Sequence, residues 1–215
     1  MGAKIKGAGS SQIEIEGVKH LKDVSYNIMS DRIEAGTFLC IAAMNHSNII
    51  VKNIDEDHII PIIDKLEEAG CELQIEDRQI QIKAPKKLKS VNIKTMPYPG
   101  FPTDMQSIFA TLLTTAKGSS IIVENIFENR YRHIPELVRM GAAVKTEGKV
   151  AVVEGVEILY GASVEAPDLR GGAALVVAGL CAEGKTEIGG VEYIERGYEC
   201  IESTLTSIGA DIKKI

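Results

Sequence analysis

The sequence predicts a single α/β domain over residues 1–215, built from three repeats with helices inside and β-sheets outside. The first observation behind this prediction is a glycine followed by a small residue and then, two positions later, by an apolar residue. This motif begins at Gly2, Gly70, Gly141 and Gly209, so its copies are 68, 71 and 68 residues apart. A period of this kind is typical of an internally repeated architecture. The repeats are approximately residues 2–69, 70–140 and 141–215.

The second observation is that each later copy of the motif closes an amphipathic segment, which predicts helices at 58–69, 134–140 and 198–208. Glycine just past a helix end fits the left-handed conformation that terminates many helices. Short strands with alternating apolar residues should follow, and alternation indicates sheets with one wet face. We expect these strands at 12–17, 24–28, 79–82, 91–94, 149–153 and 162–166.

The third observation is an aspartate that precedes an apolar helix in each repeat, namely Asp31, Asp104 and Asp168. The helices expected at 35–43, 108–116 and 173–182 are apolar nearly all round, so they should be buried on most faces. One further strand should follow each of them, at 49–52, 121–124 and 186–188. The chain opens on a motif that elsewhere follows a helix, so we expect it to be part of a longer protein.

Composition narrows the classes of function. The chain is 45% hydrophobic, with a net charge of −6 and a pI near 5.4, which argues against a nucleic-acid partner. No apolar run approaches the roughly 20 residues of a membrane span, so we expect a cytoplasmic protein with no membrane partner. The cysteines lack CxxC spacing and the histidines lack ligand spacing; we expect reduced, buried thiols and neither metal nor cofactor.

The stretch 97–106 holds three prolines and a glycine, so it should be a stiff loop up to Pro102. Thr103 and Gln106 have the spacing of a capping box, which predicts a helix start there. Asp104 would then lie in the first helical turn, rigidly held at the edge of a cleft. The structural alternative is that Asp104 only stabilises the helix N-terminus.

Three arginines are candidate anion ligands. Arg130 and Arg196 are expected at the starts of the second helices of their repeats, where free amides and a guanidinium would suit an anion. The alternative is that each is solvated and paired with Glu128 or Glu195. Arg170 lies in a first helical turn, where its charge opposes the helix dipole, and two glycines follow it; both features favour a functional role.

Taken together, several strings resemble those of the UDP-N-acetylglucosamine 1-carboxyvinyltransferase family of enolpyruvyl transferases. They occur in family order and in one repeat frame: SDRIEAG (30–36), FPTDMQ (101–106), IFENR (126–130), ELVRMGA (136–142), DLR (168–170) and ERGYE (195–199). The resemblance implies an inverse α/β barrel domain, one of two that enclose a ligand cleft. It also implies that this chain lacks the companion domain with its reactive cysteine loop, so that the chain alone should be inactive.

The resemblance assigns roles to individual residues. Asp104 is similar to the carboxylate that contacts the sugar 3-hydroxyl and acts as base, and Ile126 to a position whose backbone contacts the UDP-sugar. Arg196 resembles a ligand of the phosphate of phosphoenolpyruvate, Arg130 and Arg170 resemble cleft-lining arginines, and Asp168 resembles a carboxylate near the reacting carbons.

Two other functions stay open at this point. One is a domain like that of 5-enolpyruvylshikimate-3-phosphate synthase, although the FPTDMQ and ENR strings argue against it. The other is a non-catalytic repeat module that binds a nucleotide sugar or a protein partner. If the family function holds, the substrates are phosphoenolpyruvate and UDP-N-acetylglucosamine, and the pathway is peptidoglycan synthesis, which serves cell-wall biogenesis, cell shape and cell division.

Overall fold

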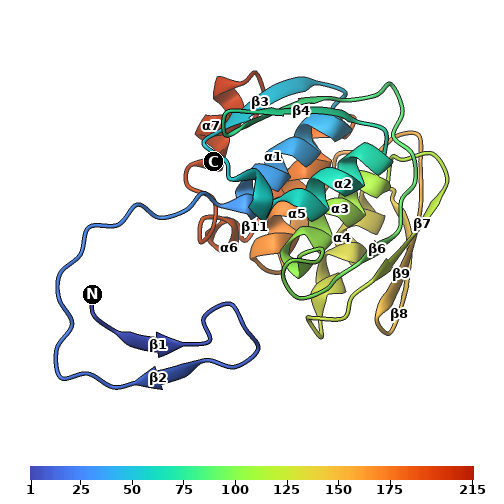
Figure 1. The fold of residues 1–215 in the computed structure, drawn as a ribbon. Helices are drawn as coiled ribbons and strands as arrows, with labels where there is room; N and C mark the ends of the chain where they lie inside the picture. The colour runs from blue at the N-terminus through green and yellow to red at the C-terminus, as the bar shows by residue number, and fades with distance from the viewer.

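The computed structural model describes residues 1–215 and has three helices at its centre. These are α1 (Arg32–Met44), α3 (Gln106–Leu113) and α5 (Leu169–Cys181), one from each predicted repeat. Each of the three packs against the other two, and every residue of α3 is buried. Figure 1 shows the sheets and the remaining helices around this centre. The prediction of an α/β fold with helices inside and sheets outside is therefore confirmed.

Three sheets surround the central helices. The first has the order β3-β5-β4 and the second the order β6-β7-β9-β8, whereas β10 and β11 form a parallel pair. Their bounds are β3 (Asn48–Lys52), β4 (Glu72–Glu76), β5 (Gln79–Lys83), β6 (Ile93–Lys94), β7 (Ser119–Val123), β8 (Ala143–Glu147), β9 (Val150–Glu154), β10 (Ser163–Glu165) and β11 (Glu187–Gly189). In β5 the predicted alternation holds, because Ile80 and Ile82 are fully buried and alternate with polar residues that are half-buried or exposed.

The repeated glycines end three outer helices, α2 (Ile60–Glu68), α4 (Ile134–Arg139) and α7 (Ile201–Ser207). Gly70, Gly141 and Gly209 have φ angles of +100°, +94° and +102°. After α2, the Gly70 amide donates to the Glu67 carbonyl and the next amide to the Leu66 carbonyl, which is the Schellman pattern. The same two bonds recur after α4 and α7, so the sequence period marks a repeated helix end.

Two predicted elements differ from the structure. Residues 24–28 form no strand, since no neighbouring strand lies beside them to supply hydrogen bonds. The helix predicted at 198–208 begins only at Ile201, because Cys200 takes a left-handed conformation with φ +47°; a short helix α6 (Val191–Ile194) precedes it.

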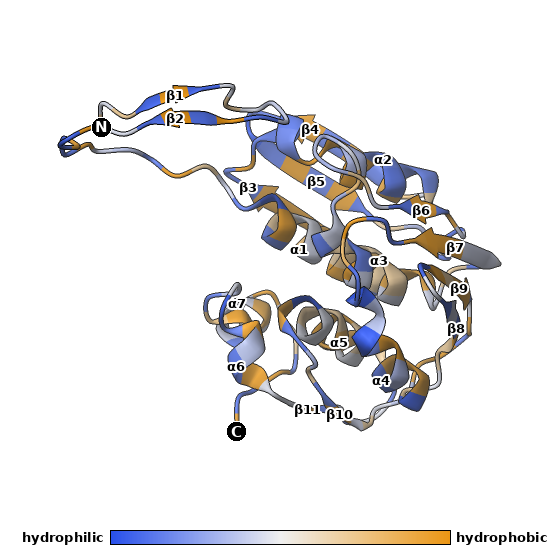
Figure 2. Ribbon diagram, turned by 90° about the horizontal axis from the view of Figure 1, so that it is seen from below, coloured by the Kyte–Doolittle hydropathy of each residue, from blue (hydrophilic) through white to orange (hydrophobic).

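Residues 1–29 are exposed throughout and contain the hairpin β1 (Lys4–Lys6) and β2 (Glu14–Glu16). Figure 1 shows this hairpin standing away from the rest of the molecule, and Figure 2 shows apolar and polar residues alternating along it. The core runs instead from Ile33 to Leu205. None of the helices is both long enough and apolar enough to cross a membrane.

Candidate active site

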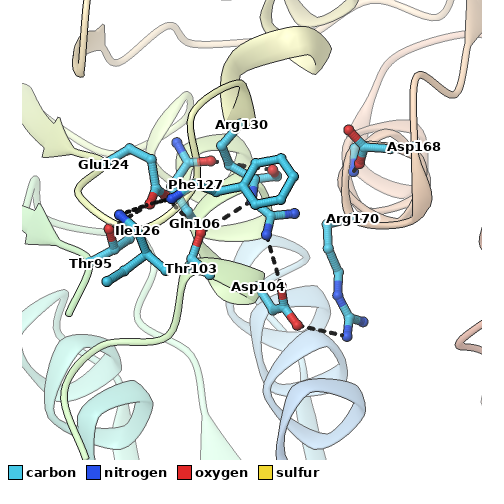
Figure 3. Close-up of polar contacts among 12 residues, drawn as sticks. Thr95, Thr103, Asp104, Gln106, Glu124, Ile126, Phe127, Arg130, Asp168 and Arg170 are labelled. Atoms are coloured by element: carbon cyan, nitrogen blue, oxygen red, sulfur yellow. Dashed lines mark hydrogen bonds and ion pairs between the residues drawn. The ribbon is translucent and has the colours of Figure 1, made fainter. Parts of the chain in front are cut away.

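Asp104 lies at the centre of a polar cluster that joins two repeats. It sits in the one-turn helix η2 (Thr103–Met105) directly before α3, as the sequence predicts, and its side chain is 40% exposed. Its Oδ1 accepts a hydrogen bond from Arg130 Nη2 at 2.9 Å, and its Oδ2 accepts one from Arg170 Nη2 at 3.1 Å. Figure 3 shows the carboxylate between these two guanidinium groups. Each oxygen therefore holds one charged partner.

Arg130 is shielded from solvent, with 8% of its side chain exposed. It begins the short helix η3 (Arg130–His133), and its Nε donates to Thr103 Oγ1 at 3.2 Å. The ring of Phe127 covers the guanidinium at 4.3 Å, a cation–π contact. The alternative of a solvated arginine paired with Glu128 is therefore wrong.

Arg170 lies in the first turn of α5 as predicted, and Tyr198 supports it from another segment. Arg170 Nη1 donates to the Tyr198 hydroxyl at 3.4 Å, and that hydroxyl lies 2.8 Å from Thr37 Oγ1 on α1. Since Thr37 uses its own proton on the Ile33 carbonyl, Tyr198 must donate to Thr37. Burial raises the pKa of Tyr198, so the phenol stays neutral. Tyr198 and Thr37 thus link the cluster to α1, while Arg170 belongs to α5 and Asp104 to η2, which directly precedes α3.

At the centre of the cluster one carboxylate lies between two guanidinium groups. Both arginines are largely shielded, with 8% and 13% of their side chains exposed, whereas the carboxylate between them is more open. Shielded guanidinium groups form strong, directional contacts with phosphate or carboxylate oxygens. This arrangement suits an anionic ligand that also brings a hydrogen-bond donor to Asp104.

The helix start predicted at Thr103 is confirmed, but the side-chain capping hydrogen bonds are absent. Thr103 makes no cap hydrogen bond, since its hydroxyl donates to Glu124 Oε2 at 3.0 Å and accepts from Arg130. Asp104 caps nothing either, whereas Asp31 accepts from the amides of its own helix start. The aspartate of the second repeat is thus the one that departs from the capping role.

Asp168 caps a central helix. It is the N-cap of α5, and its Oδ1 accepts a hydrogen bond from the Gly171 amide at 2.8 Å. Figure 3 shows Asp168 apart from the Asp104 ion pairs, with no contact drawn to them. The two glycines after Arg170 have a packing reason: a Cβ on Gly171 would lie 2.7 Å from Pro167, and one on Gly172 would lie 2.6 Å from Ile194.

Arg196 does not begin a helix, so that prediction is wrong. It is exposed in the turn between α6 and α7, and it forms no ion pair or side-chain hydrogen bond within the chain. Its neighbour Glu195 pairs with Lys214. The structure therefore does not bring Arg196 into the cluster around Asp104.

Ile126 lies in an exposed turn whose backbone amides donate hydrogen bonds to the buried carboxylate of Glu124. Its amide donates to Glu124 Oε1 at 2.8 Å, and the Phe127 amide donates to the same oxygen at 2.9 Å. The Ile126 carbonyl accepts no hydrogen bond within the chain and stays available. Glu124 and Tyr198 were missed by the sequence analysis; the only signal for Glu124 is an acidic residue that directly follows the apolar strand β7.

His133 packs beneath Arg130. Its Nδ1 lies 3.1 Å from the Arg130 carbonyl oxygen, and the ring is fully buried. Burial lowers the pKa of His133 to about 4, so the imidazole is neutral at neutral pH and adds no charge to the site. Since a carbonyl only accepts hydrogen bonds, the ring proton lies on Nδ1.

Comparison with known proteins places the chain in a family. The family model described as EPSP synthase (3-phosphoshikimate 1-carboxyvinyltransferase) matches residues 1–205. A UDP-N-acetylglucosamine 1-carboxyvinyltransferase from Desulfofundulus thermocisternus is 53% identical, and the match covers 99% of this chain and 88% of the relative. The chain therefore belongs to the enolpyruvyl transferase family.

Other relatives are longer than this chain. A UDP-N-acetylglucosamine 1-carboxyvinyltransferase 1 from Caldanaerobacter subterraneus subsp. tengcongensis is 51% identical over 99% of the chain, which covers 51% of that relative. The chain spans about half the length of most of the curated relatives that it matches.

Two solved structures agree with the fold. One is the enolpyruvyl transferase NikO from Streptomyces tendae, which is 27% identical in sequence. The match covers 99% of this chain and 51% of the NikO chain, with a TM-score of 0.83. The other is an EPSP synthase from Acinetobacter baumannii, whose match covers 99% of this chain and 53% of the synthase chain with a TM-score of 0.76. Because the two sequences are only 18% identical, this match supports the fold alone.

Proposed function

We propose that this chain is the part of an enolpyruvyl transferase that holds the acceptor hydroxyl, and that the acceptor is UDP-N-acetylglucosamine. The observation that carries the proposal is Asp104, an accessible carboxylate fixed between two shielded guanidinium groups. The choice of acceptor is supported by relatives of about half identical sequence over the whole chain, which are named for that substrate. The EPSP synthase in the structural comparison is much more distant.

In the proposed reaction, the 3-hydroxyl oxygen of the sugar adds to C2 of phosphoenolpyruvate, and C3 gains a proton. The C–O bond to phosphate then breaks, C3 loses a proton, and enolpyruvyl ether and inorganic phosphate result. The hydroxyl needs a base, and the leaving phosphate needs cations. In the proposal Asp104 supplies the first, and the guanidinium groups of Arg130 and Arg170 supply part of the second.

The two ion pairs constrain how Asp104 would take the proton. Each of its oxygens already accepts a hydrogen bond from a guanidinium group, so the incoming hydroxyl must use a remaining lone pair. An incoming phosphate or carboxylate offers Arg170 an alternative partner, which would free Oδ2 to receive the hydroxyl.

The remaining candidate residues would have roles other than proton transfer. Ile126 would contact the UDP-sugar through its free carbonyl, since its amide is engaged. Asp168 would act mainly through α5, and Arg196 would reach phosphate only in the assembled enzyme, with the companion domain present. Reaction in the cytoplasm and in peptidoglycan synthesis is part of the same proposal.

The test uses the longer enzyme that contains this chain. Phosphate release is measured from phosphoenolpyruvate with UDP-N-acetylglucosamine and, separately, with shikimate 3-phosphate as acceptor. We expect turnover with the first acceptor only. Turnover with shikimate 3-phosphate alone would assign the chain to the sister activity, and release with neither acceptor would contradict the proposal.

A further inference from the structure

Glu124 is a buried carboxylate that no sequence motif identifies. It follows β7 directly and is 2% exposed. Four neutral donors converge on it: Thr95 Oγ1 at 2.8 Å and the amides of Ile126 and Phe127 at 2.8 and 2.9 Å on Oε1, and Thr103 Oγ1 at 3.0 Å on Oε2. A buried carboxylate is tolerated only when such donors satisfy it. The position is therefore built around the carboxylate.

The donors come from three separate parts of the chain. Thr95 follows β6, Thr103 immediately precedes Asp104, and Ile126 and Phe127 form the exposed turn after β7. Figure 3 shows Glu124 on the far side of Thr103 from the Asp104 ion pairs. Thr103 also accepts from Arg130, so a continuous set of hydrogen bonds leads from Glu124 through Thr103 and Arg130 to Asp104.

We propose that Glu124 is a positioning residue that fixes the distance between the turn carrying Asp104 and the turn formed by Ile126 and Phe127. This inference rests on the proposed function, in which Asp104 receives the hydroxyl proton and the Ile126 backbone contacts the sugar. A sugar held by one turn must present its hydroxyl to a carboxylate on the other. A misplacement of about 1 Å between such groups costs on the order of 100-fold in rate.

Glu124→Gln should keep the hydrogen bonds to the turn at Ile126 and Phe127 but weaken the hydrogen bond to Thr103. Three donors share Oε1, so the glutamine oxygen should stay there and keep the turn at Ile126 and Phe127 in place. Its NH₂ group then faces the Thr103 hydroxyl, which must accept from both glutamine and Arg130 and loses its own acceptor. The link to the Asp104 turn is thereby weakened while the fold is kept.

The first experiment tests the geometry on this chain alone, without catalysis. Amide hydrogen exchange is followed by NMR at Ile126 and Phe127. We expect both amides to be protected although their side chains are exposed, and we expect Glu124→Ala to speed their exchange at least about 10-fold. Exchange at Ile126 and Phe127 as fast as in an open loop, in the unsubstituted chain, would overturn the inference.

The second experiment measures kinetics in the enzyme that contains this chain. Glu124→Gln should lower kcat for UDP-N-acetylglucosamine about 100-fold with a smaller change in KM, because the base is displaced more than the sugar site. Glu154→Gln is the matched control, since it makes the same change at an exposed position on β9 of the same sheet. A purely structural role for Glu124 would lower the melting temperature and leave kcat of the folded enzyme unchanged.

A second pair of variants tests the same hydrogen bond from Thr103, so that the inference can be judged even if Glu124→Gln does not fold. Thr103→Val keeps the shape and removes the hydroxyl, whereas Thr103→Ser keeps the hydroxyl. We expect the valine variant to behave like Glu124→Gln and the serine variant to retain most activity. Folded Glu124→Gln and Thr103→Val enzymes with kcat within about threefold of the Glu154→Gln control would overturn the inference alone. An unsubstituted enzyme without UDP-N-acetylglucosamine turnover would instead overturn the proposed function.

Discussion

Replacing Asp104 by asparagine distinguishes an ion-pair and base role from a helix-cap role. Asparagine has one oxygen and one NH₂ group in place of two equivalent oxygens. It can still accept from one arginine, but its NH₂ group must face the other guanidinium, which only donates. One of the two contacts at 2.9 and 3.1 Å is therefore lost, and the other becomes a contact with a neutral group.

The size of the effect follows from these two contacts. A hydrogen bond to a charged group contributes about 1.5–3 kcal/mol, and the 40% exposure of the Asp104 side chain reduces that contribution through solvent screening. We expect Asp104→Asn to lower the free energy of unfolding of this chain by about 1–2 kcal/mol. For a domain of this size that corresponds to a fall in Tm of about 2–8 °C.

The assay is differential scanning calorimetry of the chain, with Asp64→Asn as the control. Asp64 is exposed on α2 and forms no ion pair, so its replacement should shift Tm by less than about 2 °C. In the longer enzyme, Asp104→Asn should also lose about 10²–10⁴ in turnover, the usual range for a general base. An unchanged Tm with near-normal turnover would refute the reasoning, because asparagine caps helices about as well as aspartate.

Three further predictions concern the rest of the molecule. The pKa of His133 is about 4 in the folded chain and near 6.5 in the unfolded chain. Between about pH 4 and pH 6.5 the unfolded chain therefore binds more protons than the folded chain. Stability should therefore fall by up to about 3 kcal/mol as pH drops from about 6.5 to 4, and urea titrations of His133→Gln should show a weaker fall. Iodoacetamide at pH 8 should modify exposed Cys200 well before Cys181, whose pKa burial raises to about 12, as mass spectrometry would show. Gly155→Ala places a Cβ 1.6 Å from a backbone carbonyl oxygen and should cost about 1–3 kcal/mol in urea unfolding, whereas Gly17→Ala, with nothing within 4 Å, should cost almost nothing.

Features set by neighbouring residues could be predicted from the sequence. Gly70 and its two later equivalents mark helix ends because the left-handed conformation and the glycine requirement are both local. The position of Asp104 in a first turn follows equally from the prolines before it and the apolar spacing after it. The central helices were recognisable because they are apolar on almost every face.

Features that depend on distant residues could not be predicted. Arg130 lies 26 residues and Arg170 lies 66 residues from Asp104, and no local pattern records that they converge on it. Because the two guanidinium groups are stronger hydrogen-bond partners than free helix amides, the Asp104 carboxylate pairs with them and does not cap the helix. Arg196 was misplaced for a local reason, because the left-handed residue Cys200 separates it from α7.

The central trio of helices has a consequence for synthesis of the chain on the ribosome. Helix α1 is buried on most faces and packs on α5, whose first residue follows the last residue of α1 by 125 positions. At about 5–20 residues per second, α1 waits roughly 6–25 s before that partner is made. During this interval α3, β3 and β5 can already cover part of α1, but the face that packs on α5 has no native cover. A holding chaperone would find on that face an early binding site on the nascent chain.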